Sequence, residues 1–92
     1  MNYTLEFTIQ ALEDIEKHKK SGNKSVLLKI KQLLNELREH PRTGTGQPEL
    51  LKHELVGLYS RRINRKHRLV YSIKEDIVTV YILSAFAHYS DK

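Results

Sequence analysis

The sequence predicts an α+β fold in which an N-terminal strand and a two-helix hairpin pack on a mainly antiparallel sheet. Three observations support this fold class. Apolar and polar residues alternate over positions 3–7, apolar residues recur at helical spacing over 9–40, and the pattern from position 49 onward is that of consecutive strands. At 92 residues the chain is too short for two independent cores, so a single domain over 1–92 is expected.

The N-terminal pattern predicts one strand and then a helix. Residues 3–7 have the alternation of a half-buried strand. Thr8 is suited to cap the helix that follows, and Gly22 is suited to end it. The acidic residues of this helix, Asp14 included, are expected to face water, and so is His18. Its inward stripe is expected to consist of Ile9, Leu12 and Ile15.

A second helix is the most regular pattern in the chain. Asn23 or Ser25 is placed to begin it, and Pro41 is placed to end it, because the residue before a proline disfavours helical dihedral angles. The apolar residues between these two ends follow helical spacing: Val26, Leu27, Ile30, Leu33, Leu34 and Leu37.

The remaining half of the chain predicts a loop and then strands. Positions 41–48 contain two glycines and two prolines, which is typical of a loop. Strands are expected over 58–63, 67–73 and 77–86, with a tight turn near 74–76. The last strand is apolar on both faces, so it is expected to lie inside the sheet.

Charge and composition restrict the class of protein. The net charge is +5, and the basic segment from Lys52 to Arg68 contains six basic residues and one acid. This segment favours a polyanionic partner, either nucleic acid or an acidic protein; a solvated surface is the alternative. No cysteine is present, which excludes disulfides and thiolate chemistry. No long apolar segment or secretory leader is apparent, so a cytoplasmic protein with no membrane partner is expected.

Arginines occur within two of the expected strands, where an unpaired guanidinium is unfavourable to bury. Arg61 or Arg62 on one strand and Arg68 on the next are therefore positioned to bind a phosphate. The alternative is an ion pair across the sheet with one of three acids: Glu49, Glu54 or Glu75.

Two further features concern chemistry. His88 and Tyr89 follow the last strand and offer a group that titrates near neutral pH beside a ring that stacks on bases; an exposed tail without a role is the alternative. Glu49, His53 and His88 lack the spacing of metal ligands and have cationic neighbours, so no metal or other cofactor is expected.

Three blocks of sequence stand out beside the His88-Tyr89 ending: Gly46-Gln47-Pro48-Glu49-Leu50-Leu51-Lys52-His53, Gly57-Leu58-Tyr59-Ser60-Arg61-Arg62-Ile63 and His67-Arg68-Leu69-Val70-Tyr71. Together they resemble the YoeB (Txe) branch of the RelE toxin superfamily, and the similarity covers nearly the whole chain. The resemblance implies a toxin of a bacterial type II toxin–antitoxin pair, acting as a ribosome-dependent endoribonuclease that cuts mRNA and inhibits translation.

The resemblance also implies roles for matched residues. Glu49 corresponds to the general base, Arg68 to the arginine that faces the scissile phosphate, and His88 to the general acid. RNA supplies its own 2′-OH nucleophile, so this chemistry needs no metal. Contacts to phosphate or support of the active site are implied for Lys52, His53 and Arg62, and positioning of the substrate for Tyr89.

Partners follow from the same resemblance. They are the decoding site of the 30S ribosomal subunit with its mRNA, and an acidic, partly disordered antitoxin similar to YefM. A homodimer is compatible with the resemblance, and the sequence leaves a monomer open. Two other functions use the same basic segment without catalysis: a toxin of this fold that blocks ribosomes or a topoisomerase, and a small domain that binds an acidic protein segment.

Departures from the family pattern lie close to the matched blocks. Tyr59 stands where tryptophan is usual, and Arg65 and Lys66 replace residues that are often acidic. The chain also continues through 90–92, whereas many relatives end at the His-Tyr pair.

Overall fold

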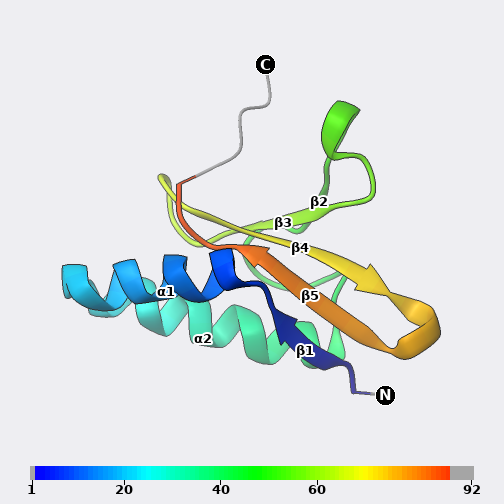
Figure 1. Ribbon diagram of the computed structural model, residues 1–92, viewed down its shortest axis with the longest axis horizontal. Helices are drawn as coiled ribbons and strands as arrows, with labels where there is room; N and C mark the ends of the chain where they lie inside the picture. Colours follow the sequence, from blue (N-terminus) through cyan, green and yellow to red (C-terminus); the bar gives the residue numbers. More distant parts are fainter. Residues whose placement is uncertain (1, 88–92) are drawn as a thin grey trace.

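The computed structural model describes residues 2–87 (Figure 1). Two helices are followed by most of the strands, as the sequence predicts. The elements in chain order are β1 (Thr4–Phe7), α1 (Ile9–Ser21), α2 (Lys24–Glu39), β2 (Glu49–Leu50), β3 (Tyr59–Arg62), β4 (Arg68–Lys74) and β5 (Thr79–Ser84), with short 3-10 helices at His53–Leu55 and Glu75–Ile77.

The five strands form one sheet in the order β1-β5-β4-β3-β2. β1 pairs with β5 in parallel, and the other three pairings are antiparallel. Both helices lie on the same side of this sheet (Figure 1). The α+β fold class is therefore confirmed, and so is the interior position of β5. Within the described residues, neither helix has the length and apolar character needed to cross a bilayer.

The helix ends lie where the cap residues predict. The side chain of Thr8 accepts a hydrogen bond from the amide of Ala11 at 3.0 Å, which satisfies a free donor of the first turn. Asn23 caps α2 in the same way through the amide of Val26, at 3.2 Å. Gly22, which follows α1, has a φ of 74°, a conformation that glycine adopts without a Cβ clash.

The core lies between the helices and the sheet. Four of the predicted α2 residues are buried in it (Val26, Ile30, Leu33 and Leu37). The sheet contributes Leu69, Tyr71, Val80 and Ile82, and Ile63 joins them just after β3. Of the stripe expected on α1, only Ile15 packs against this cluster.

The orientation of α1 corrects the prediction from its apolar spacing. Ile9 and Leu12 are 76% and 55% exposed, whereas Asp14 and His18, which were expected to face water, are each 2% exposed. The reason is the position of α1 over the chain that leaves β5, where the backbone of Ala85 needs polar partners. Asp14 and His18 supply them, so the polar side of the helix faces inward.

Candidate active site

A carboxylate and two guanidinium groups share the face of the sheet that points away from the helices. Leu69 belongs to the core, so its neighbour Arg68 points to the opposite face. Arg62 of β3 lies directly opposite Arg68 of β4, and Glu49 of β2 lies opposite Ser60. Because paired residues share a face and side chains alternate, Glu49, Arg62 and Arg68 are together on the outer face.

Glu49 and Arg68 are close enough to form an ion pair. Oε1 of Glu49 lies 3.5 Å from Nη1 of Arg68. The glutamate side chain is 55% exposed and the arginine side chain 22% exposed, so water screens their attraction and the pair contributes little to stability. The arrangement instead leaves an accessible carboxylate beside a partly buried cation.

Arg62 increases the positive charge at this site. It is exposed, and its strand neighbour across the ladder is Arg68. Like charges directly opposite each other on a sheet are unfavourable unless an anion lies between them or nearby. Of the two arginines that the sequence left open as phosphate-binding candidates on β3, the register thus places Arg62 on the same face as Arg68.

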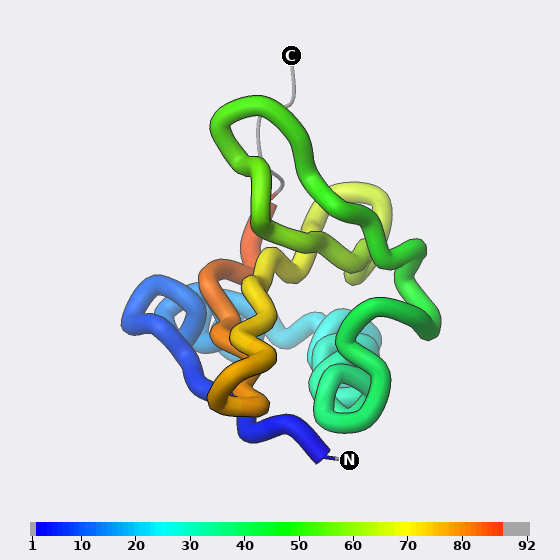
Figure 2. Tube along the Cα trace, turned by 90° about the vertical axis from the view of Figure 1, so that its right-hand side faces the viewer, coloured from blue at the N-terminus to red at the C-terminus, as the bar shows by residue number. Residues whose placement is uncertain are grey.

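Lys52 and His53 lie on the connection between β2 and β3, which projects from the rest of the chain (Figure 2). Both side chains are exposed. His53 begins the short 3-10 helix with a φ of 61°, a left-handed conformation that is rare for residues other than glycine. Among residues 2–87, no three His, Asp or Glu side chains gather closely enough to hold a metal ion.

His88 and Tyr89, the predicted acid and its aromatic neighbour, lie outside the described residues. The segment before them is described. The carbonyl of Ala87 accepts a hydrogen bond from the amide of Arg68 at 2.9 Å, so the chain is beside Arg68 one residue before His88.

Arg61 has a structural role, which corrects its inclusion among the phosphate-binding candidates. Its side chain is fully buried on the helix side of the sheet, and Nη1 lies 2.8 Å from Oε1 of Glu36 on α2. Nε donates to the hydroxyl of Tyr71 at 3.2 Å, and Nη2 donates to the carbonyl oxygens of His40 and Thr43. A buried guanidinium with this many partners has no donor left for a ligand on the outer face.

Of the three acids expected to pair with the arginines of the sheet, one does so among residues 2–87. Glu49 pairs with Arg68, as that alternative allows. Arg61 instead pairs with Glu36, which lies on a helix and was not considered. Glu75 contacts Arg42, and it also accepts a hydrogen bond from the hydroxyl of Tyr3.

The loop at 41–48 is shaped around Arg61. Gly44 has a φ of 129°, and a Cβ there would lie 2.5 Å from Oε1 of Glu36 and 2.8 Å from Nη1 of Arg61. Glycine is therefore required at this position by the close approach of the ion pair. The amide and hydroxyl of Thr45 also donate to Glu36. A loop predicted from its composition alone thus serves to bury a charge.

The contacts of the Glu36 side chain determine its protonation state. Burial alone raises the pKa of Glu36, but hydrogen bonds from Thr45 and Gln32 and the charge of Arg61 outweigh it, so the pKa lies below its usual value. Burial raises the pKa of Tyr71. The phenol therefore stays protonated and donates to the carbonyl of Pro41 at 2.8 Å.

A polar cluster that the sequence did not predict lies at the end of β5. Asp14, His18 and His67 are all buried, and they hydrogen-bond to the backbone of Ala85 and Ala87. A signal for it exists in the sequence, because Asp14 and His18 are four residues apart and so share one face of α1. The apolar stripe that includes Ile9 and Leu12 predicted a different inward face for this helix.

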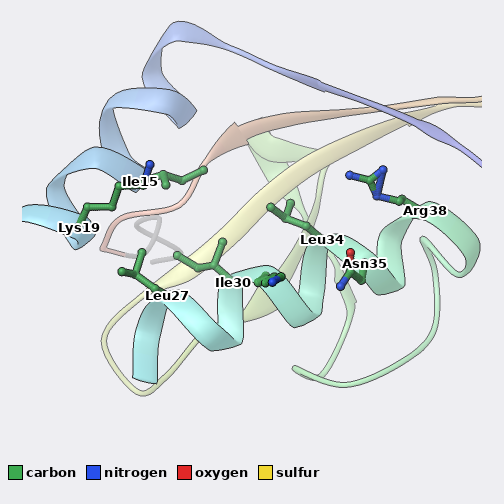
Figure 3. A pocket seen from close by; sticks show the side chains of 8 residues that line it. Ile15, Lys19, Leu27, Ile30, Leu34, Asn35 and Arg38 are labelled. Atoms are coloured by element: carbon green, nitrogen blue, oxygen red, sulfur yellow. The ribbon is translucent and has the colours of Figure 1, made fainter. Parts of the chain in front are cut away.

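A shallow hollow of about 410 Å³ lies between α1 and α2 (Figure 3). It contains none of the predicted site residues, and it lies on the helix side of the sheet. Its lining contains four apolar residues (Ile15, Leu27, Ile30 and Leu34), three basic residues (Lys19, Lys31 and Arg38) and Asn35.

Comparison with known proteins gives consistent results. Residues 7–89 match the family described as the YoeB-like toxin of bacterial type II toxin–antitoxin systems. The chain is 43% identical to toxin YoeB of Escherichia coli strain K12 over 58 residues, 63% of this chain and 69% of that protein. It is 37% identical to toxin YoeB of Streptomyces coelicolor over 83 residues, 90% of this chain and 95% of that protein.

Solved structures show the same fold. The YoeB dimer from Staphylococcus aureus superposes with a TM-score of 0.79 at 39% identity, covering 97% of this chain and 100% of that chain. The YoeB/ParE toxin from Agrobacterium tumefaciens superposes with a TM-score of 0.86 at 29% identity, covering 94% of this chain and 99% of that chain. Because the family match spans most of the chain and the fold agrees, this chain belongs to the YoeB-like toxins of bacterial type II toxin–antitoxin systems.

Proposed function

We propose that this toxin is a ribosome-dependent endoribonuclease that cuts mRNA without a metal ion. The observation that carries the proposal is the pairing of Glu49 with Arg68 at 3.5 Å on the outer face of the sheet, with Arg62 directly opposite Arg68. An exposed carboxylate beside paired guanidinium groups is suited to deprotonate a hydroxyl next to a phosphate and to stabilise the charge that develops.

In this proposal the ribose 2′-OH attacks the adjacent phosphorus. Glu49 takes the hydroxyl proton, Arg68 and Arg62 stabilise the crowded anionic intermediate, and His88 gives a proton to the departing 5′-oxygen. The products are a 2′,3′-cyclic phosphate on one fragment and a 5′-OH on the other. Further contacts to the RNA are proposed for Lys52, His53 and Tyr89.

The openness of the site supports a need for the ribosome. Glu49 is 55% exposed, and the connection that carries Lys52 and His53 projects from the sheet (Figure 2). Such a surface cannot by itself hold a flexible RNA in line for attack. A ribosome that presents mRNA in a fixed conformation supplies this orientation, which contributes about 7–11 kcal/mol in ideal cases. We also propose that the toxin acts in the cytoplasm, where ribosomes translate mRNA. Residues 1–92 are proposed to form one domain.

An antitoxin is the second proposed partner. The solved structure of the related Staphylococcus aureus protein is a heterotetrameric complex of YoeB and YefM, and a dimer of that YoeB is also known. We propose that an acidic, partly disordered antitoxin similar to YefM covers the basic segment of this chain, and that the toxin itself forms a homodimer.

The test is to incubate the purified toxin with mRNA, either free or on translating ribosomes, and to map the ends by primer extension. Cleavage of ribosome-bound message only, with 2′,3′-cyclic phosphate ends, is expected. Arg68→Ala should abolish it, whereas Lys74→Ala, which removes a cation from the exposed end of the same strand, should not. Intact message under conditions where translation stops would contradict the nuclease and favour a non-catalytic toxin that blocks the ribosome, or a topoisomerase poison if only DNA topology changes.

A further inference from the structure

Three buried side chains hold the segment that follows β5. The amide of Ala85 donates to Oδ2 of Asp14 at 2.9 Å, and the carbonyl of Ala85 accepts from Nε2 of His18 at 2.8 Å. The amide of Ala87 donates to Nδ1 of His67 at 2.7 Å. We call Asp14, His18 and His67 the 85–87 clamp.

The clamp is more than an extension of the sheet. A strand that continued past Ser84 would use backbone partners, but here two residues of a helix and one imidazole replace them on Ala85 and Ala87. Only the carbonyl of Ala87 retains a backbone partner, the amide of Arg68 at 2.9 Å. All four backbone polar groups of the two alanines are thus fixed.

Phe86 packs into the same cluster. Its ring centroid lies 5.0 Å from that of His18 and 4.5 Å from that of His67, and the two imidazole rings meet edge to face at 4.6 Å. Nζ of Lys17 lies 4.8 Å from the centre of the Phe86 ring. Phe86 is still 37% exposed, so its packing holds the segment rather than filling the main core.

The last clamped residue is in a strained conformation. Ala87 has a φ of 59°, in the left-handed region that an L-residue with a Cβ seldom adopts. Such a conformation persists only where its surroundings hold it, and residues of this kind concentrate at functional sites. The strain is at the residue that is joined to His88 and hydrogen-bonded to Arg68.

We infer that Asp14, His18 and His67 are positioning residues for the proposed acid His88, because they fix the chain as far as Ala87, the residue that precedes it. This inference rests on the proposed nuclease. All three side chains are buried, so we expect them to act through the segment that leads to His88. Their loss should reduce the rate of the chemical step and leave ribosome binding unchanged.

Asp14 offers a conservative replacement that separates positioning from folding. Its Oδ1 accepts from Nε2 of Gln10 at 2.7 Å, and its Oδ2 holds Ala85. In Asp14→Asn, one oxygen can keep Ala85 while the new amide group faces Gln10, whose own amide can rotate to present oxygen. Asp14→Ala removes both acceptors. His67→Asn and His67→Leu form a second pair, because the asparagine oxygen lies near the position of Nδ1.

The experiment compares these variants in single-turnover cleavage of ribosome-bound mRNA at saturating ribosomes. We expect Asp14→Ala and His67→Leu to be about 10- to 100-fold slower, with the ribosome dissociation constant unchanged, and the asparagine variants to recover most of the rate. Val80→Ala is the control, because it removes core packing from the opposite end of β5. It should leave the rate unchanged.

A double variant tests whether the clamp acts through His88. In a His88→Gln background, Asp14→Ala should slow the residual cleavage no further. A full additional loss there, or a normal rate in Asp14→Ala itself, would overturn the positioning role.

Amide hydrogen exchange gives a result that does not depend on activity. The amides of Ala85 and Ala87 should be protected in the wild type and in Asp14→Asn, and the Ala85 amide should exchange at least about tenfold faster in Asp14→Ala. Equal exchange in all three proteins would contradict the clamp. If the wild type cuts no mRNA while these amides exchange as expected, the proposed function is wrong, and the positioning role is wrong with it. If the wild type cuts mRNA while the amides exchange equally in all three proteins, only the positioning role is wrong.

Discussion

Arg62 and Arg68 lie directly opposite each other on β3 and β4, so the register places both arginines on the outer face of the sheet. Glu49 compensates part of this charge from β2, at 3.5 Å from Arg68. Like charges opposite each other on a sheet are unfavourable, and in the proposed function an RNA phosphate binds beside both arginines. Stability and RNA binding should therefore respond in opposite directions when one arginine is removed.

Arg62→Gln is the variant that shows this. We expect its melting temperature in low salt to be equal to or a few degrees above that of the wild type, because a like-charge contact disappears. Its affinity for ribosome-bound mRNA should fall, and the salt dependence of binding should decrease by roughly one phosphate contact. Thermal unfolding and binding titrations at several salt concentrations measure the two effects. Lower stability together with unchanged binding would show that Arg62 is only structural.

Removal of Arg61, in contrast to removal of Arg62, should lower the stability of the protein. Its guanidinium is fully buried, so Arg61→Ala leaves Tyr71 and the carbonyl oxygens of His40 and Thr43 without their donor and removes the ion pair with Glu36. Leaving buried acceptors unpaired costs about 1–3 kcal/mol. Urea unfolding should show a loss of that size, whereas Arg62→Ala on the exposed side of the same strand should change stability by less than about 1 kcal/mol. Equal losses in the two variants would contradict the buried role of Arg61.

The free energy of unfolding should depend on pH because of Glu36. Its pKa is lowered in the folded protein, so the unfolded chain takes up the proton at higher pH than the folded protein does. The stabilisation is therefore complete above the ordinary glutamate value of 4.5 and is lost as the pH falls through the folded value. Denaturation curves from pH 7 to 3 should show this loss in the wild type and a weaker pH dependence in Glu36→Gln. Glu39→Gln, at the exposed end of α2, is the control.

Ser60 is buried opposite Glu49, and among the described residues its hydroxyl has no hydrogen-bond partner. An unsatisfied buried hydroxyl is unfavourable by about 1–3 kcal/mol, so Ser60→Ala should fold with equal or greater stability. Chemical denaturation checks this expectation. A clear loss of stability would mean that the hydroxyl is bonded in solution.

Most of the fold could be predicted from local signals. Thr8, Asn23 and Gly22 mark the helix ends through interactions with neighbouring residues. The apolar run at 77–86 marks an interior strand, and β5 is indeed paired along both edges, with β1 and β4. The orientation of α1 could not be predicted in this way. It depends on the backbone of Ala85, which lies 71 residues after Asp14 in the chain.

The candidate site could likewise be predicted only where local signals are sufficient. Alternation places Arg61 and Arg62 on opposite faces of β3, but only the register shows that Arg62 shares a face with Arg68. Arg61 remained an equivalent candidate, because nothing local shows that Glu36 and the loop carbonyls surround it. The roles of Glu49, Arg68 and His88 come from family resemblance, and they stay predictions until activity is measured.

The most direct test of the account is the rate at which Glu49→Gln cuts ribosome-bound mRNA in a single turnover. The substitution keeps the size of the side chain and removes the base, so the rate should fall by at least about 100-fold while ribosome binding is retained. Glu54→Gln, an exposed acid on the same connection, should cut at the wild-type rate. Cleavage by Glu49→Gln within a few-fold of the wild type would contradict the proposed site.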